Sequence, residues 1–553
     1  MLRSAAGAIG TDHHLMRVKI KLHLKSRKKI MKQKKIKYDS AKFKDDKSSE
    51  LFQGDLNGTL SEASNESIGI DEKYSLFVEH LKIHAEKYFK LDNNTNRKRK
   101  EWLTDEILQI VDQKSLAFLN WQNHRGTKLE AKTRSKYKQL RKLAKKKIDA
   151  RQIEYWDEIC EEVENSIKLN DPANAFSIIR RLRGGSKRVE NMPIKDRNGN
   201  LLLNSSDRLE RWREYFHELF NVPSIVDQKI IDEIQIGTLS EEEKRQNAAP
   251  SIEEVRKALF QMKSRKAPGN DEITADLLKA GGEPVIHWLY GIFVDIWKNE
   301  VMVQDWNLAI LIRLYKKGEK QICDNYRGIS LLNVTSKIFS RIILNRIQNM
   351  IDHQLLEAQS GFRAHRSTMD QIHILNITME KRREFNKSLF MCFIDITKAY
   401  DSVNRDLLWR VCRKYGISEK LVNLFKMLYK NSKAKVKIEG ELSDSFLIET
   451  GVQQGGIPSP ILFNILFDFI VRKVIEEAGV TGVKFSYGSN DFFHAKRESY
   501  ENFNILALLY ADDLVAMCET ASDLTTFIRA FENVTHEFGL TMSVKKTCIM
   551  TLQ

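Results

Sequence analysis

The sequence has few cysteines and no long apolar run. Its six cysteines are scattered without a CxxC pair, which argues against a zinc knuckle within this chain and against a disulfide scaffold. No apolar run reaches the roughly 20 residues that span a bilayer. The N-terminus lacks the short apolar core and cleavage site of a secretory signal, and no internal repeat is found. These absences predict a soluble intracellular protein that engages no membrane.

What is abundant is charge, with an excess of basic residues. The 553 residues are 42% hydrophobic, enough for a large buried core, and a chain of this length should split into about two to four structural units. Lysine and arginine total 90 against 74 acidic residues, a formal net charge of +16. This excess favours a polyanionic partner, most often nucleic acid, although a basic but otherwise ordinary protein would show it too.

The first 72 residues divide into two expected parts. Residues 1–24 include an alternating apolar and polar stretch at 15–22 that predicts a strand. Residues 25–72 form a basic and polar linker. Its lysine-rich run at 25–37 could serve nuclear import or nucleic-acid contact, or could be a solvated tail. The stretch 48–71 is rich in Ser, Asn, Gly and acidic residues, which predicts a linker.

The next expected unit, 73–250, is mainly helical. The pattern from 102 to 183 is helical, is densely basic between Lys128 and Arg151, and has helix ends at Asp171–Pro172 and Gly184–Gly185. A turn at 196–200 precedes an amphipathic stretch at 209–220. From 251 to 553 apolar strands, glycine-bearing loops and helices alternate, which predicts a mixed α/β body.

Two segments of this body end in carboxylates. The apolar run 389–394 predicts a buried strand and is followed by Asp395. The run 506–517 predicts a hairpin with Asp512 and Asp513 at its tip. An Asp-Asp pair in a turn is usually only a turn, because aspartate favours turns. Three aspartates on two adjacent strands could instead hold two Mg²⁺ ions about 4 Å apart, the arrangement of nucleotidyl transfer.

A series of motifs then resembles a known family. "FIDITKAYDSV" (393–403) and "LLYADDLVAM" (508–517) resemble the two metal-binding motifs of reverse transcriptases, and "GVQQGGIPSPILFN" (451–464) resembles their template-and-nucleotide motif. Upstream lie "KAPGNDEI" (266–273), "NYRGISLLN" (325–333) and "QSGFRAHRST" (359–368). In this order the set resembles reverse transcriptases of non-LTR (LINE-type) retrotransposons, most closely the RTE/BovB-like group.

The resemblance assigns the metal site and its surroundings. It implies that Asp395, Asp512 and Asp513 bind two Mg²⁺ ions, for which Mn²⁺ could substitute. It places Tyr400 as an aromatic steric gate against the ribose 2′-hydroxyl, with core packing as the alternative role. Asp401 is expected to be structural.

It also assigns residues to the incoming nucleotide. Arg327 matches an arginine that grips the triphosphate, and Lys316 or Lys317 could supply a second cation, with the register between them open. Gln454 and Gly455 resemble a pair that lies against the nascent base pair, where glycine allows close backbone approach. Ser459–Pro460 is expected to start the helix behind this pair.

The last motif is "GLTMSVKKT" at 539–547. Its Lys546 resembles a lysine that donates a proton to the leaving pyrophosphate. Ser543 stands where the family usually has asparagine, which makes the match looser.

The ends of the chain also resemble parts of these elements. "GTDHHLMRVKIKLHL" at 10–24 resembles the last strand of the endonuclease that precedes the polymerase, with Asp12 and His13 as its closing pair. The chain stops after the lysine motif, so the thumb helices are expected to be absent and activity to be impaired.

The expected fold is α+β: a right-hand polymerase palm, with a ferredoxin-like sheet, and fingers, preceded by a mainly helical basic region. The expected function is an RNA-directed DNA polymerase that uses an RNA template, a DNA primer and dNTPs, in the nucleus and cytoplasm. One alternative is an RNA-binding remnant or co-opted fragment without catalysis. Another is a viral-type RNA-dependent RNA polymerase, which the aromatic Tyr400 disfavours.

Overall fold

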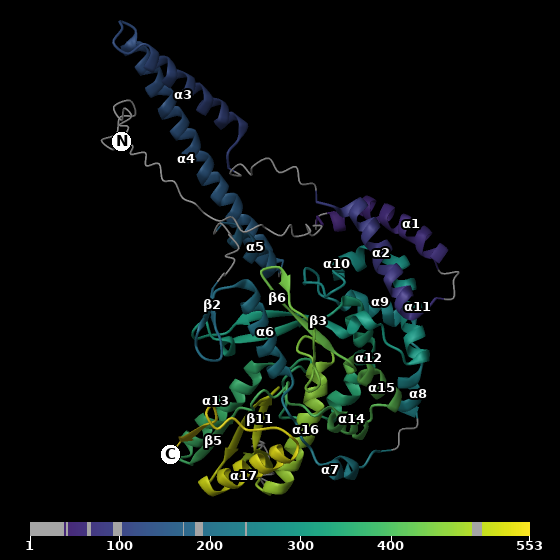
Figure 1. Cartoon of the computed structure of the whole chain (residues 1–553). Helices are drawn as coiled ribbons and strands as arrows, with labels where there is room; N and C mark the ends of the chain where they lie inside the picture. The colour runs from purple at the N-terminus through teal and green to yellow at the C-terminus, as the bar shows by residue number, and fades with distance from the viewer. Residues whose placement is uncertain are drawn as a thin grey trace, which may run out of the picture.

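A computed structural model of the chain describes residues 38–39, 42–63, 68–91, 102–169, 171–182, 192–237, 241–488 and 500–552 (Figure 1). The strand expected at 15–22, the basic run at 25–37, the Asp12–His13 pair and the helix end at Gly184–Gly185 lie outside these residues.

The structure is a mixture of helices and short strands, as expected for an α+β protein. The helices are α1 Asp46–Ala63, α2 Ile70–Phe89, α3 Asp105–Asn123, α4 Glu130–Lys168, α5 Pro172–Leu182, α6 Ser205–Phe220, α7 Gln228–Glu233, α8 Glu241–Asn247, α9 Ile252–Gln261, α10 Ala275–Ala280, α11 Gly282–Asn299, α12 Val334–Gln354, α13 Thr368–Glu384, α14 Arg405–Lys414, α15 Glu419–Tyr429, α16 Ser459–Ala478 and α17 Ala521–Glu537. The strands are β1 Ile194–Lys195, β2 Leu201–Leu202, β3 Leu308–Tyr315, β4 Tyr326–Leu331, β5 Leu389–Ile394, β6 Lys433–Ile438, β7 Glu441–Leu442, β8 Phe446–Leu447, β9 Val483–Gly488, β10 Tyr500–Ile505, β11 Ala507–Tyr510, β12 Asp513–Cys518 and β13 Cys548–Leu552.

The sheet that carries the acidic motifs has the order β11-β12-β5-β13, and all its neighbours are antiparallel. Successive side chains of β5 point to opposite faces. Leu389 and Met391 pack in one cluster with side chains of α13, whereas Cys392 and Ile394 belong to the large core that includes α17. Because both faces are covered, every position of β5 favours an apolar residue, which explains the continuous apolar run in the sequence.

A second sheet has the order β4-β3-β6-β7, with β8 also paired to β6. Helix α6 packs on it through Trp212, Phe216 and Phe220, which are buried together with strand residues. This confirms the amphipathic stretch expected at 209–220, which the structure shows to be part of a helix. A side chain at Gly328 in β4 would meet the Phe216 ring at 2.7 Å, so glycine lets the helix approach the sheet closely.

The stretch expected to be a linker, 48–71, is instead largely helical, and that prediction is wrong. Phe52, Leu56 and Leu60 recur every fourth residue on one face of α1 and are buried in the main core. Helix α1 contacts α2 and α11, which bury that face. The Ser, Gly and Asn residues that suggested a linker lie within this helix, whose stability comes from the packing of its apolar face.

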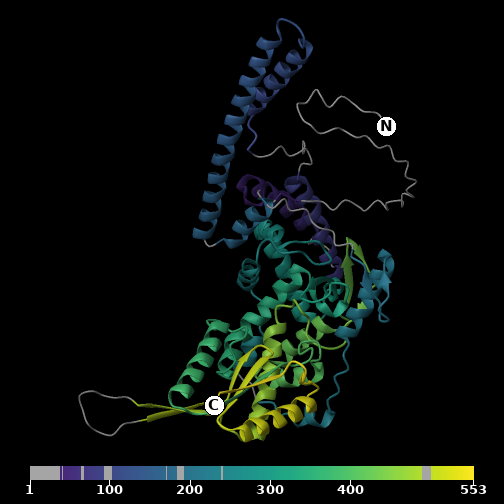
Figure 2. The ribbon, with the colours of Figure 1, turned by 90° about the vertical axis from the view of Figure 1, so that its left-hand side faces the viewer.

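The region 102–182 forms helices α3, α4 and α5, which confirms the helical pattern and the helix boundary at Asp171–Pro172. Helices α3 and α4 pack against each other as a long hairpin that projects from the body (Figures 1 and 2). The turn expected at 196–200 joins β1 to β2, with Gly199 in the left-handed region at a φ of 86°.

All six cysteines are free thiols. No helix in the described part of the chain combines the length and the apolar character needed to cross a membrane.

Candidate active site

Two adjacent strands bring the three predicted aspartates to one edge of a sheet. In the antiparallel register Leu514 lies opposite Ile394. Asp513, just before Leu514, and Asp395, just after Ile394, are therefore also neighbours. Tyr510 pairs with Asp513 across the β11–β12 hairpin, which leaves Ala511 and Asp512 as its two-residue turn. The predicted strand and hairpin are confirmed, with Asp512 in the turn and Asp513 as the first residue of β12.

The three carboxylates act on one another electrostatically. Burial raises the pKa of Asp512, and the negative charges of Asp513 and Asp395 raise it further. Burial also raises the pKa of Asp513, again with a contribution from Asp395. A carboxylate cluster whose charge is disfavoured in this way gains stability from a bound cation.

Lys546 supplies a cation to this cluster. Its Nζ lies 2.9 Å from Asp395 Oδ1, and its charge lowers the pKa of Asp513. The loop that carries it is tied to the chain after β5, because Ser543 N donates to the Asp395 carbonyl at 2.8 Å and Thr397 N donates to the Thr541 carbonyl at 2.9 Å. Lys546 is therefore at the carboxylates, where the sequence placed it.

The donor set fits a magnesium ion by its chemistry, since it offers carboxylate oxygens alone. Within the described residues, however, no three His, Cys, Asp or Glu side chains are gathered closely enough to hold one ion. The backbone thus sets the aspartates on neighbouring strands, while the Asp395 side chain is paired with Lys546. Metal binding would require these side chains to turn toward a shared ion.

One residue at this edge escaped the sequence analysis. Gln359, whose side chain is 2% exposed, accepts a hydrogen bond at Oε1 from Ala511 N at 2.9 Å and donates from Nε2 to the Ala511 carbonyl at 3.2 Å. Ala511 has a φ of 58°, a left-handed conformation that disfavours residues with a side chain. Gln359 thereby holds the residue just before Asp512. Its place in the "QSGFRAHRST" motif was the available signal.

Tyr400 lies beside the carboxylates. Its ring stacks on Phe463 of α16 with centroids 4.3 Å apart. Burial raises its pKa, and the charges of Asp512 and Asp513 add to the rise. Its hydroxyl is buried and has no hydrogen-bond partner among the described residues. The stacked ring forms a rigid wall next to the sheet edge that carries the aspartates.

Asp401, the next residue, contacts another predicted site residue. Gln454 Nε2 donates to both carboxylate oxygens of Asp401, at 2.9 and 3.0 Å. Asp401 is 6% exposed, and burial raises its pKa to about 7. Because this bond uses the Gln454 amide nitrogen, the Gln454 Oε1 is the atom left to accept a further hydrogen bond.

The loop that carries Gln454 is held against β4 and against the chain after β5. Gly455 has a φ of 108°, and a Cβ there would lie 2.4 Å from the Ser330 carbonyl oxygen. Ser330 N in turn donates to the Gln454 carbonyl at 3.1 Å. Gly451 has a φ of 72°, and a Cβ there would lie 2.7 Å from the Asp401 backbone. Helix α16 then begins at Ser459 with Pro460 in its first turn, as expected.

Arg327 and Lys316 come from the β3–β4 hairpin. Arg327 in β4 is exposed. Its positive charge acts to lower the pKa values of Asp512, Tyr400 and Asp401, against the larger effect of burial, which raises them. The pKa of Lys316 is lowered, mainly by burial and then by Arg327 and Lys546. Lys316 therefore faces the same cluster of charges.

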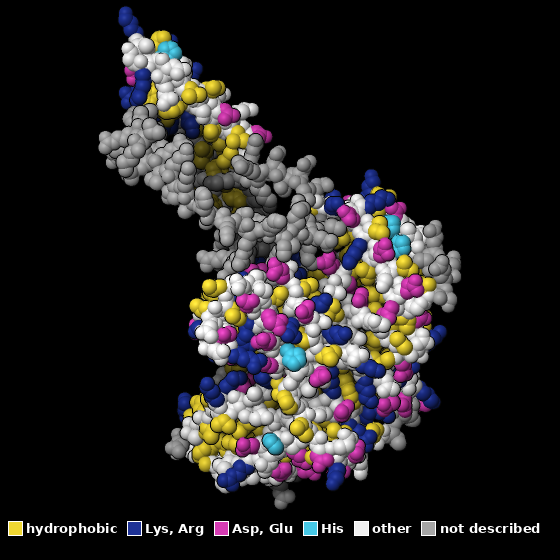
Figure 3. Space-filling model, in the orientation of Figure 1, with side chains coloured by type: hydrophobic (Ala, Val, Ile, Leu, Met, Phe, Trp, Pro, Cys, Tyr) yellow, Lys and Arg dark blue, Asp and Glu magenta, His cyan; other side chains and the backbone are white. Residues whose placement is uncertain are grey.

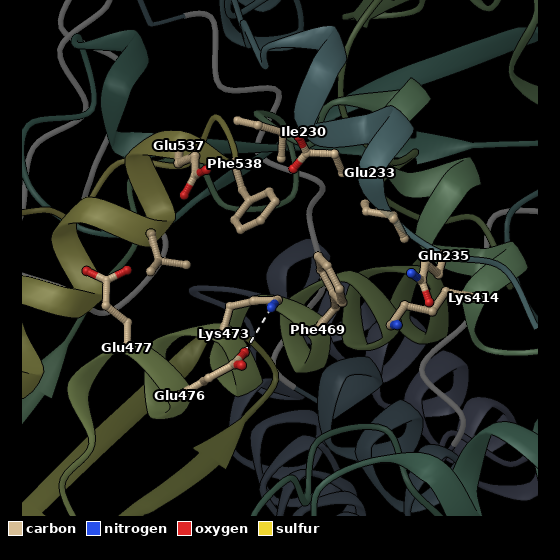
Figure 4. A pocket seen from close by; sticks show the side chains of 12 residues that line it. Ile230, Glu233, Gln235, Lys414, Phe469, Lys473, Glu476, Glu477, Glu537 and Phe538 are labelled. Atoms are coloured by element: carbon tan, nitrogen blue, oxygen red, sulfur yellow. Dashed lines mark hydrogen bonds and ion pairs between the residues drawn. The ribbon is translucent and has the colours of Figure 1, made fainter.

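A pocket elsewhere on the molecule contains none of these residues. It lies between α7, α16 and α17, and Phe469, Lys473 and Glu476 are among the residues that line it (Figure 4). Lys473 is paired with Glu476 at 2.8 Å within it. Unlike the sheet edge, it gathers no set of carboxylates from neighbouring strands.

Comparisons with known proteins agree with this geometry. Residues 314–553 match the family described as "Reverse transcriptase (RNA-dependent DNA polymerase)". The chain is 27% identical over 314 residues to the RNA-directed DNA polymerase from mobile element jockey of Drosophila funebris, covering 54% of this chain and 31% of that protein. It is 28% identical over 228 residues to the Pol polyprotein from type-1 retrotransposable element R2 of Nasonia vitripennis, covering 41% of this chain and 20% of that protein.

A third relative is the probable RNA-directed DNA polymerase from transposon X-element of Drosophila melanogaster, 30% identical over 220 residues, which are 38% of this chain and 23% of the relative. The chain thus spans about a third or less of the length of these relatives. The matched region holds the three aspartates, Tyr400 and Gln454. Residues 314–553 of this chain are therefore similar to reverse transcriptase domains.

Proposed function

We propose that this protein is an RNA-directed DNA polymerase of a non-LTR retrotransposon, related to the RTE/BovB-like group. It would transfer deoxynucleotides to a primer 3′-hydroxyl on an RNA template. The observation that carries the proposal is the meeting of Asp395, Asp512 and Asp513 on two neighbouring strands within the matched domain. The sheet of β5, β11 and β12 would be the polymerase palm, and the β3–β4 hairpin would belong to the fingers.

The three carboxylates would hold two Mg²⁺ ions, which when bound would activate the primer hydroxyl and neutralise the departing charge. Holding such ions requires the Lys546–Asp395 pair to open, since Lys546 occupies one Asp395 oxygen. Once released, the Lys546 ammonium would lie near the leaving pyrophosphate and could give it a proton. The same lysine would then neutralise Asp395 before binding and act as a general acid during transfer.

The incoming nucleotide would lie between the β3–β4 hairpin and the aspartates. Arg327 suits the triphosphate because its planar guanidinium can form two parallel hydrogen bonds to phosphate oxygens. Lys316 would add a second positive charge, favoured over Lys317 by its approach to Arg327 and Lys546. Burial is the main cause of the lowered pKa of Lys316, and the positive charges of Arg327 and Lys546 lower it further. A bound triphosphate would offset the effect of these neighbouring charges.

The sugar and base would meet Tyr400 and Gln454. The Tyr400 ring is fixed by its stack on Phe463, so it can exclude a 2′-hydroxyl by its bulk. Gln454 is oriented by Asp401, and Gly455 lets the backbone approach.

We also propose, from the sequence alone, that the protein is found in the nucleus and the cytoplasm and that residues 1–24 are a remnant of an endonuclease.

The test is primer extension by the full chain on a primed RNA template with dNTPs and Mg²⁺. Asp512→Asn should abolish extension, because it removes a proposed metal ligand while keeping the size of the side chain. Glu532→Gln, an exposed carboxylate on α17, is the matched control and should extend like the wild type. Equal extension by wild type and Asp512→Asn, or none by the wild type while RNA is still bound, would leave the non-catalytic RNA-binding alternative.

A further inference from the structure

The hairpin of α3 and α4, the arm, is divided along its length by charge. Within α4, residues 130–151 contain ten basic and two acidic residues, whereas residues 152–168 contain one basic and six acidic residues. Helix α4 runs from the free end of the arm to the body (Figure 1), so its basic part lies at the free end and its acidic part lies next to the body. Figure 3 shows Lys and Arg side chains at that free end. The sequence shows the clustering of charge, and the structure adds where each cluster lies.

The packing of the arm turns its basic residues outward. Tyr137, Leu140 and Ala144 lie on the side of α4 that meets α3, where Tyr137 stacks on Trp121 with centroids 5.7 Å apart. Lys138, Lys142 and Lys145 recur at i, i+4 and i+7 on the opposite side and are all exposed. These three lysines form no ion pair with another residue in the described ranges, unlike Lys147, which pairs with Glu106 at 2.8 Å.

We propose that the free end of this arm binds the phosphate backbone of a double-helical nucleic acid. The 22 residues of the basic part rise about 33 Å at 1.5 Å per residue, close to the roughly 34 Å of one turn of a duplex. Lysines spaced along that length can meet successive phosphates. A lysine ammonium group attracts a phosphate whatever the neighbouring bases are, so we expect this contact to be independent of nucleotide sequence.

The aromatic residues favour a duplex over a single strand. Proteins that grip single strands present aromatic faces on which bases stack. In residues 130–151 the one aromatic side chain is Tyr137, and its ring is already stacked on Trp121. Trp121 itself lies within reach of two arginines, Arg125 and Arg134, at 5.2 and 5.7 Å. The basic part of α4 therefore offers charge without a free stacking platform, since the exposed Trp156 lies in the acidic part.

The acidic part of α4 limits where the duplex can lie. Its six carboxylates repel phosphates, so the duplex is held at the free end. The arm and the sheet β11-β12-β5-β13 lie at opposite ends of the molecule (Figure 1). The duplex contact at the arm is therefore separate from the proposed nucleotide site on that sheet. It does not depend on the chain being an active polymerase.

The test uses the full chain, labelled 20-base-pair DNA and RNA–DNA duplexes, and the matching single strands, with the dissociation constant measured over a salt series. In Lys138→Gln/Lys142→Gln/Lys145→Gln, duplex binding should weaken roughly tenfold or more. The slope of log affinity against log salt should also fall by up to about 2.7, at about 0.9 per lost phosphate contact. The two duplexes show which kind of helix is preferred. The arginine version of the same triple variant is the matched control and should keep wild-type binding.

An unchanged salt slope in the glutamine variant would overturn the proposal. It would also be overturned if the wild type bound the single strand more tightly than the duplex and the glutamine variant lost affinity for both equally. Circular dichroism of both variants confirms that the helices remain. The rate of single-nucleotide incorporation on a saturating short primer–template should be the same in the glutamine variant and the wild type. A fall in that rate would show that the arm acts at the proposed nucleotide site. It would overturn the proposal that the arm binds the duplex at a separate site.

Discussion

The side-chain amide of Gln359 bonds to both backbone polar groups of Ala511, its oxygen to the amide nitrogen at 2.9 Å and its nitrogen to the carbonyl at 3.2 Å. The two segments are also linked by the backbone, because Ser360 N donates to the Leu509 carbonyl and Leu509 N to the Ala358 carbonyl. The left-handed Ala511 is thus fixed from a neighbouring segment. This bond sets the turn from which Asp512 projects.

Gln359→Met should therefore damage catalysis as well as stability. Loss of a buried pair of hydrogen bonds should lower the free energy of unfolding by about 1–3 kcal/mol. Because Asp512 loses its fixed position, the turnover number should fall and the Mg²⁺ concentration for half-maximal rate should rise. Hydrogen exchange should show faster exchange of the Ala511 amide. Steady-state kinetics with a Mg²⁺ titration and urea unfolding measure the other effects.

The chain contains a matched control for this substitution. Gln246 is also fully buried, and its amide donates to the Gly416 carbonyl at 2.8 Å and accepts from Ser418 N at 2.7 Å. It has the same kind of contact away from the aspartates. Gln246→Met should lower stability similarly and leave the Mg²⁺ requirement unchanged. If both variants raise that requirement equally, Gln359 has only a general structural role.

Asp401 should make the stability depend on pH. Burial raises its pKa from 3.8 to about 7 in the folded protein, although Lys398, Arg327 and Lys316 act in the opposite direction. Between these pH values the folded state holds a proton that the unfolded state has lost. The contribution of this group to stability is therefore fully present below about pH 4 and decreases as the pH rises to about 7.

Asp401→Asn should remove this dependence. The rise in the Asp401 pKa from 3.8 to about 7 corresponds to a change of at most about 4 kcal/mol in the free energy of unfolding between these two pH values, at 1.36 kcal/mol per pKa unit. Urea unfolding of both proteins between pH 5 and pH 8 measures it, and the wild type should lose more stability than the variant as pH rises. Since asparagine can still accept from Gln454, the KM for dNTPs should change little. Parallel stability curves would contradict the raised pKa.

Tyr400→Ala should weaken the discrimination between deoxynucleotides and ribonucleotides. Removing the ring opens the space that a 2′-hydroxyl would need, and one steric contact of this kind is worth roughly 10- to 100-fold. The ratio of kcat/KM for dCTP and CTP on the same RNA template measures this. The control variant Tyr400→Phe keeps the ring and should preserve the ratio, since the tyrosine hydroxyl has no partner among the described residues. A wild-type preference for ribonucleotides would instead indicate an RNA-dependent RNA polymerase.

The acidic strands could be predicted from the sequence because their signals are local. The apolar run before Asp395 reports a strand covered on both faces, and the Asp512–Asp513 pair falls where the chain must turn. Helices 102–182 were predicted for the same reason. Their periodicity and breakers need no tertiary information.

Other features depend on partners far away in the chain. Helix α1 was missed because its glycines and polar residues outweigh three apolar positions whose partners lie in α2 and α11. Gln359 was not singled out because its bond to Ala511 joins residues 152 positions apart. The choice between Lys316 and Lys317 likewise depends on where Arg327 and Lys546 lie in space.

Gly455→Ala should damage the nucleotide site through the backbone. A Cβ at this position would lie 2.4 Å from the Ser330 carbonyl oxygen, and the φ of 108° disfavours any side chain. The loop must move away from β4, so the KM for dNTPs should rise several-fold and stability should fall. Gly479→Ala is the control, because its φ of 61° has the same sign but nothing lies within 4 Å of the added Cβ. It should cost about 1 kcal/mol of stability and leave the KM unchanged.

Substitutions in α1 test whether 46–63 is a packed helix. Gly54 and Gly58 are exposed, and an added Cβ would meet nothing within 4 Å. If the segment is helical, Gly54→Ala and Gly58→Ala should each raise the free energy of unfolding by about 0.5–1 kcal/mol. Leu56→Ala, on the buried face, should lower it by about 2–5 kcal/mol. In an unstructured linker all three substitutions would leave urea unfolding unchanged, so a null result for Leu56→Ala would contradict the packing of α1 on α2 and α11.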